Sequence, residues 1–129
     1  MVAKVRLIIA GGRDFNNYIL LKKRVSALCT RLFKEGGTIE IVCGKAPGAD
    51  TLGERFAKEK GFTVKEFPAE WNRYKQAAGP IRNTEMAEYA THLIAFWDGN
   101  SPGTNNMIAQ AKKRGLGIRV VKYGSWSRK

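Results

Sequence analysis

Four segments of the chain combine glycine or proline with polar side chains suited to binding an anion. Glycine lacks a Cβ, so its backbone N–H can approach a phosphate closely. An arginine guanidinium pairs with phosphate or carboxylate through two parallel hydrogen bonds. The segments occupy residues 11–15 (GGRDF), 44–50 (GKAPGAD), 68–83 (PAEWNRYKQAAGPIRN) and 98–107 (DGNSPGTNNM).

The residue types in these segments divide into contacts for the phosphate, the sugar and the base of a nucleotide. For the phosphate, Gly11-Gly12 and Gly103-Thr104 offer backbone N–H groups, and Arg13 and Arg82 offer positive charge. Aspartates can accept from ribose hydroxyls or a base edge, and a tryptophan can stack on a base. The candidate binding residues are Gly11, Gly12, Arg13, Asp14, Gly44, Gly48, Ala49, Asp50, Trp71, Arg82, Asn83, Gly99, Ser101, Gly103 and Thr104.

Each of these signals taken alone also has a purely structural interpretation. Gly11-Gly12 can simply end a strand, and Asp50 can simply cap a helix. Neither the G-x-G-x-x-G fingerprint nor a Walker loop occurs. The case for a ligand site therefore depends on the four segments meeting at one place.

The hydrophobic pattern predicts elements that bring the segments together. Apolar runs predict five strands, and helical spacing between them predicts four helices, with a polar, aromatic loop over 69–78. The strands are expected at 5–10, 38–43, 62–67, 91–97 and 117–123, and the helices at 18–34, 49–60, 80–90 and 103–114.

This strict alternation predicts an α/β fold with a parallel sheet between two layers of helices. We expect a Rossmann-like α/β/α sandwich with strand order 3-2-1-4-5, in a single domain over 1–129 with a short basic polar tail at 124–129. Ligands of such sheets bind beyond the carboxyl ends of the strands. All four polar segments follow a strand, so they are expected to share that rim.

Composition argues against several other kinds of site. His92 is the only histidine and is expected at the opposite rim, which disfavours histidine-based catalysis or a metal centre. Cys29 and Cys43 form no disulfide or zinc pattern, and Cys43 is interpreted as a buried apolar group. We expect no metal and no cofactor. The apolar runs are shorter than the ~20 residues that span a bilayer, so a cytoplasmic protein without membrane contact is expected.

The net charge of +12 is distributed unevenly along the chain. Residues 1–35 carry +6, residues 36–111 carry −1 and residues 112–129 carry +7. The excess therefore lies mostly outside the four segments. It predicts either a solvated basic surface or a nucleic-acid-binding surface that includes Lys112, Lys113 and Arg114.

The ordered motifs resemble the YspA-related branch of the SLOG superfamily over about residues 5–123. The residues that carry the resemblance are Gly11-Gly12-Arg13-Asp14-Phe15, Gly44-x-Ala46-x-Gly48-Ala49-Asp50, Trp71, Ala78-Gly79-Pro80-x-Arg82-Asn83-x-x-Met86 and Phe96-Trp97-Asp98-Gly99-x-Ser101-x-Gly103-Thr104. The superfamily also holds the LOG phosphoribohydrolases and a domain of the DNA-processing protein DprA. The resemblance implies a nucleotide or nucleotide-derived ligand, a homodimer or larger homo-oligomer, and a sensing, sequestering or processing role in bacteria or phages.

Whether the chain is an enzyme stays open. LOG enzymes cleave the N-glycosidic bond of nucleoside monophosphates with an arginine and a glutamate. Arg82 matches their arginine, but Asn106 aligns with the glutamate, and an amide cannot act as a base. Among the aspartates that could substitute, Asp98 is the best placed in sequence, because it directly follows the fourth strand. Arg82 and Asp98 are thus the candidate catalytic residues.

Overall fold

The chain folds around a five-stranded parallel sheet, as the alternating pattern predicts. The computed structural model describes residues 4–33 and 37–124. The strand order is β3-β2-β1-β4-β5, and every neighbouring pair is parallel. The strands are β1 (Lys4–Gly11), β2 (Thr38–Cys43), β3 (Thr63–Glu66), β4 (His92–Trp97) and β5 (Gly117–Lys122).

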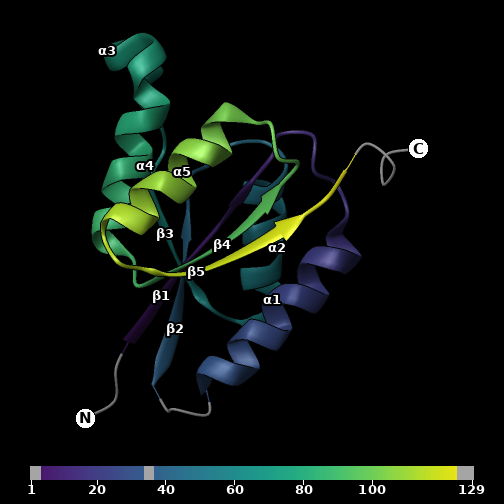
Figure 1. The fold of residues 1–129 in the computed structure, drawn as a ribbon. Coiled ribbons are helices and arrows are strands. Elements are labelled where there is room, and N and C mark those ends of the chain that lie inside the picture. The colour runs from purple at the N-terminus through teal and green to yellow at the C-terminus, as the bar shows by residue number, and fades with distance from the viewer. Residues whose placement is uncertain (1–3, 34–36, 125–129) are drawn as a thin grey trace.

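Helices cover both faces of the sheet (Figure 1). On one face, α1 (Tyr18–Phe33) and α2 (Ala49–Lys60) pack in the cluster that contains Leu7 and Ile9. On the other, α4 (Ala78–Tyr89) and α5 (Pro102–Lys113) pack in the cluster that contains Ile8 and Ala10. Because successive side chains of a strand point to opposite faces, the continuous apolar run of β1 serves both cores.

The segment 69–78 differs from the predicted loop. It contains the short helix α3 (Trp71–Tyr74) and a 3-10 turn (Lys75–Ala77), and α4 then begins at Ala78 instead of Pro80. The Glu70 carbonyl accepts from the N–H groups of Arg73 and Tyr74 at 3.0 and 2.9 Å. None of the residues of α3 is buried, so this helix leaves no apolar periodicity in the sequence.

The chain order places the predicted ligand segments at the carboxyl edge of the sheet. The Gly12 N–H donates to the Phe96 carbonyl at 3.1 Å, which joins the loop after β1 to the end of β4. A Cβ on Gly11 would lie 2.4 Å from that carbonyl oxygen, so glycine is required for this close approach. Apart from Gly124, the polar tail expected at 124–129 lies outside the described residues.

Candidate functional site

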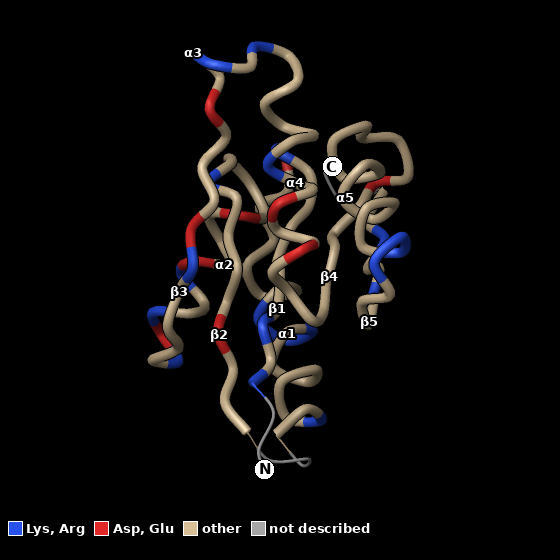
Figure 2. Tube along the Cα trace, turned by 90° about the vertical axis from the view of Figure 1, so that its left-hand side faces the viewer, with Lys and Arg blue, Asp and Glu red and all other residues tan. Residues whose placement is uncertain are grey.

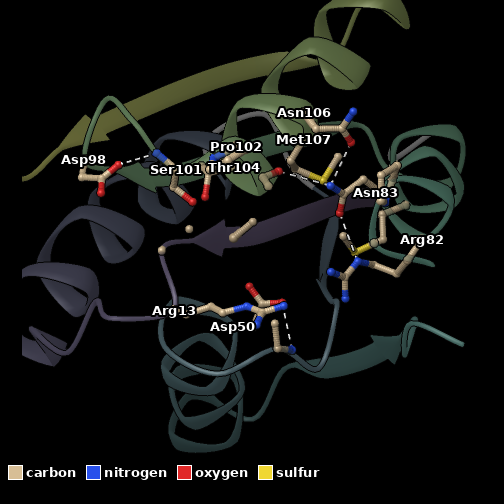
Figure 3. A pocket seen from close by; sticks show the side chains of 18 of the residues that line it. Arg13, Asp50, Arg82, Asn83, Asp98, Ser101, Pro102, Thr104, Asn106 and Met107 are labelled. Carbon is tan, nitrogen blue, oxygen red and sulfur yellow. Dashed lines mark hydrogen bonds between the residues drawn. The ribbon is translucent and has the colours of Figure 1, made fainter. Parts of the chain in front are cut away.

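A cavity of about 630 Å³ lies at the carboxyl edge of the sheet. Segments after β1, β2, β3 and β4 all contribute to its wall, and Figure 3 shows their side chains converging on it. Of the predicted residues, those that line the cavity are Gly11, Gly12, Arg13, Asp14, Asp50, Trp71, Arg82, Asn83, Asp98, Ser101, Gly103 and Thr104.

The N-terminus of α5 presents unsatisfied backbone donors to this cavity. The first intrahelical bond runs from the Asn105 N–H to the Ser101 carbonyl at 3.0 Å, and the Ser101 side chain makes no capping bond. Within the described chain, the N–H groups of Gly103 and Thr104 have no acceptor, and the first turn holds no acidic residue. The positive end of the helix dipole is thus left available for an anion.

Asp98 shapes the turn that leads into α5. Its Oδ1 accepts from the N–H groups of Asn100 and Ser101, both at 2.8 Å. This carboxylate oxygen fixes the backbone before the helix, as an Asx turn does. Asp98 thus lines the cavity and also holds the turn before α5. Its position after the fourth strand did not predict this second role.

Arg82 and Asp50 approach each other beside Gly44. Arg82 Nη1 donates to the Gly44 carbonyl, and Asp50 Oδ2 accepts from the Ala46 N–H at 3.2 Å. A Cβ on Gly44 would lie 2.7 Å from Arg82 Nη1 and 2.8 Å from Asp50 Oδ2. Glycine at position 44 thus leaves room for both charged groups where they stand.

Burial changes the acidity of both partners. Asp50 is only 5% exposed, and this burial raises its pKa to about 6, although the Ala46 N–H and the Arg82 charge act in the opposite direction. Burial likewise lowers the pKa of Arg82, and the charge of Arg13 adds to that effect while Asp50 opposes it. Two guanidinium groups that repel each other across a cavity would both be stabilised by a bound anion.

Asn83 connects α4 to α5 at the back of the cavity. Its Nδ2 donates to Asn106 Oδ1 at 3.0 Å and to the Gly103 carbonyl at 3.3 Å. Its Oδ1 accepts from Arg82 Nε at 3.0 Å. Asn83 is 6% exposed, so these bonds satisfy a buried amide and hold the guanidinium in place.

A tyrosine that the sequence did not single out supports the loop after β1. Tyr123 follows β5, and its hydroxyl donates to Asp14 Oδ1 at 2.7 Å. A Cβ on Gly12 would lie 1.9 Å from the same hydroxyl oxygen, so Gly12 makes room for this contact. The position of Tyr123 at the carboxyl end of a strand was the available signal.

Four predicted residues do not line the main cavity. Gly44 lines an adjacent cavity of about 480 Å³, whose wall also includes Arg13, Trp71 and Arg82. The Ala49 N–H donates to the Gly12 carbonyl at 3.2 Å, so α2 docks on the loop after β1 and this N–H is not left for an anion. Gly48 and Gly99 lie in the turns before α2 and α5, outside the lining.

The two other groups with possible chemistry lie apart from the cavity lining. His92 begins β4, and its Nδ1 lies 2.8 Å from Thr91 Oγ1. Cys43 is 1% exposed, and burial raises the pKa of its thiol, which makes it a poor nucleophile. In the described ranges, three or more acidic, histidine or cysteine side chains nowhere gather as a metal site would require.

The described helices also include none with the length and apolar character needed to cross a membrane.

Comparison with solved structures supports the fold. The chain superposes on the X-ray structure of DNA processing protein A (DprA) from Streptococcus pneumoniae with a TM-score of 0.69 and 17% identity. The match covers 95% of this chain but 51% of the DprA chain, so the chain spans about half of that protein. A predicted subunit of tRNA methyltransferase from Methanocaldococcus jannaschii DSM gives a TM-score of 0.42 at 13% identity, covering 97% of this chain and 71% of that one.

Sequence comparison identifies the family. No curated protein matches the chain significantly. The model of the YspA, cpYpsA-related SLOG family matches residues 5–74, which is more than half of the chain and includes the loops after β1 and β2. The chain therefore belongs to the YspA, cpYpsA-related SLOG family.

Proposed function

We propose that the protein binds a nucleotide or nucleotide-derived ligand in the cavity at the carboxyl edge of the sheet. One observation carries the proposal: a cavity of about 630 Å³ is lined both by Arg13 and Arg82 and by the open N-terminus of α5. Its volume falls in the range of small-molecule sites. Membership in a SLOG family supports a nucleotide as the anion.

The expected pose follows from the chemistry of the wall. A phosphate would accept from the N–H groups of Gly103 and Thr104, with Arg13 beside it. Arg13 lines the cavity without an ion pair or hydrogen bond among the described residues, so its guanidinium is available to a bound anion. Trp71, which is 48% exposed and lines the cavity, would stack on the base.

Isothermal titration calorimetry tests this binding. The ligands would be the four common nucleoside monophosphates and the cyclic mononucleotides. Replacing Arg13 or Arg82 by glutamine should weaken the binding of a ligand by about tenfold or more, because each removes a charge-assisted hydrogen bond. Arg31→Gln removes the same charge from α1, remote from the cavity lining, and should leave affinity unchanged.

Two results would contradict the proposal. One is the absence of heat for every nucleotide with a folded protein. The other is equal weakening by Arg31→Gln and Arg82→Gln, since that would indicate a general charge effect instead of a site.

Cleavage of the N-glycosidic bond is a second candidate function, favoured by the electrostatic attraction between Asp50 and Arg82, which both line the cavity. A carboxylate in the site can stabilise an oxocarbenium-like transition state. Asn106, which aligns with the LOG glutamate, is instead bonded to Asn83. Among the lining carboxylates, which include Asp98, Asp50 is chosen for the test because its charge acts on Arg82.

Chromatography of incubated nucleoside monophosphates would detect the free base. Release should disappear in both Asp50→Asn and Arg82→Ala, while nucleotide binding by Asp50→Asn is retained. If no monophosphate releases a base, this second candidate function is contradicted.

A further inference from the structure

A second, separate groove runs between α1 and the edge strand β5. Its volume is about 360 Å³, and it shares no lining residue with the nucleotide cavity. The groove is lined by Arg24, Ala27, Leu28 and Arg31 of α1, Ile94 of β4 and Arg119, Val120 and Val121 of β5.

The three arginines of the groove are uncompensated. Arg24, Arg31 and Arg119 are exposed and have neither an acidic partner nor a hydrogen bond within the described chain. The sequences of α1 and β5 contain no aspartate or glutamate. Figure 2 shows acidic positions on β2, α2 and α4. Glu59 of α2 reaches α1, but it pairs with Lys22, which does not line the groove. The groove therefore selects for negative charge.

The strand beside these arginines has an open edge. β5 is the last strand of the sheet and pairs only with β4 in the described structure. Val120 is 41% exposed there, although it is a large apolar residue in a strand. An exposed edge of this kind is a template on which another strand can add through backbone hydrogen bonds.

One face of β5 favours acidic side chains on an added strand, and the other face favours apolar side chains. Val121 packs in the cluster beneath α1, so Arg119 shares that face and lies with Arg24 and Arg31. Ile118 packs against the opposite cluster, so the exposed Val120 shares its face. A strand beside β5 would therefore place acidic residues against the arginines and apolar residues beside Ile118 and Val120.

Charge and lining decide among the possible occupants. A second copy of β5 would bring Arg119 and Lys122 against like charges, which disfavours self-pairing. The last five residues of the sequence include Arg128 and Lys129 and no acidic residue, so they do not complement the groove. The groove has no aromatic lining residue on which a nucleic-acid base could stack, and a phosphate backbone would not contact its apolar residues favourably.

We propose that this groove and the outer edge of β5 bind an extended segment of a partner protein in which acidic and apolar residues alternate. The segment adds to the sheet as a sixth strand. Its carboxylates pair with Arg24, Arg31 and Arg119, and its backbone pairs with β5.

Fluorescence anisotropy with a labelled, end-capped peptide of alternating glutamate and valine tests the proposal. Saturable binding is expected, with no binding of the matching lysine–valine peptide. The triple variant Arg24→Gln, Arg31→Gln and Arg119→Gln should weaken binding by about tenfold or more. The control Lys58→Gln, Lys112→Gln and Lys113→Gln removes the same charge from exposed positions elsewhere and should leave the affinity unchanged.

Amide hydrogen exchange of the wild-type protein supplies a readout that needs no variant. Binding of the acidic peptide should slow exchange in β5 and leave β3, the other edge strand, unchanged. The proposal fails if the acidic peptide does not saturate, if both triple variants weaken it equally, or if β5 gains no protection. It also fails if an oligothymidylate binds the same arginines more tightly than the peptide does.

Discussion

At the scale of single residues, the site depends on a few side chains that segments far apart in sequence bring together. Arg82 donates to the Gly44 carbonyl within the electrostatic reach of Asp50, and the Tyr123 hydroxyl donates to Asp14. The sequence could identify arginine, aspartate and glycine as suitable types. It could not show that Gly44 makes room for two charged groups, because that contact depends on the register of separate loops.

Asp50 should make stability depend on pH. Its folded pKa of about 6 lies above the ordinary value of 3.8, so the native state holds the proton more tightly than the unfolded state. The favourable contribution is complete below the unfolded pKa and is lost as pH rises through the folded pKa. Asn does not titrate, so the unfolding free energy of Asp50→Asn minus that of wild type should rise by about 2 kcal/mol as the pH goes from 4.5 to 7.5.

Urea denaturation of both proteins across that range measures the difference. Using the difference between the two proteins removes the contribution of the other titratable groups. A difference that stays constant, or that falls with pH, would show that the Asp50 carboxyl is not held neutral by burial.

At the scale of elements, the alternation of strands and helices predicted the fold because apolar residues mark the core positions. The predicted strand order 3-2-1-4-5 is confirmed. The prediction of a loop over 69–78 was wrong where α3 forms, because α3 is only four residues long and buries none of them. A helix without a buried face has no regular spacing of apolar residues, so hydrophobic periodicity does not predict it.

The short helix α3 gives Trp71 its place on the cavity wall. If the base of a nucleotide stacks there, Trp71→Ala should weaken adenosine monophosphate binding by about tenfold, since stacking on an aromatic side chain contributes 1–3 kcal/mol per base. Ribose 5-phosphate lacks the base, so calorimetry should show its affinity unchanged. Equal losses for both ligands would mean that Trp71 shapes the cavity without contacting the base.

Gly48 at the start of α2 combines a positive φ with a close contact to a neighbouring loop. Gly61 at the end of α2 has a positive φ without such a contact, so comparing the two separates the effects. Gly48 has φ +81°, and a Cβ there would lie 2.2 Å from the Gly12 carbonyl oxygen. Gly61 at the other end has φ +75° with nothing within 4 Å of its Cβ position. Gly61→Ala should thus cost about 1 kcal/mol of unfolding free energy and Gly48→Ala about 3 kcal/mol, measured in urea. Equal costs would show that α2 does not press on the loop after β1.

At the scale of the whole molecule, the basic residues behind the net charge of +12 include members of two different surfaces. Arg13 and Arg82 line the cavity, and residues 36–111, which hold three of the four polar segments, carry −1. The rest gathers on the first helix and towards the end of the chain, where Arg24, Arg31 and Arg119 line the second groove. The total charge alone could not separate these roles, because it carries no information on which side chains share a surface.

The two sites lead to separate expectations for salt. Added salt should weaken acidic-peptide binding in the exposed α1–β5 groove more strongly than nucleotide binding in the partly enclosed cavity. Exposed charges are screened more than partly buried ones. The groove and the cavity have no lining residue in common, so a substitution in one should leave binding at the other intact.

The most direct test of the account is a crystal structure of the protein grown with a nucleoside monophosphate. We expect the phosphate to lie within hydrogen-bonding distance of the Gly103 and Thr104 N–H groups and beside the Arg13 guanidinium. The base should lie against Trp71. A nucleotide found in the groove between α1 and β5, or a cavity that stays empty when calorimetry shows binding, would contradict the account.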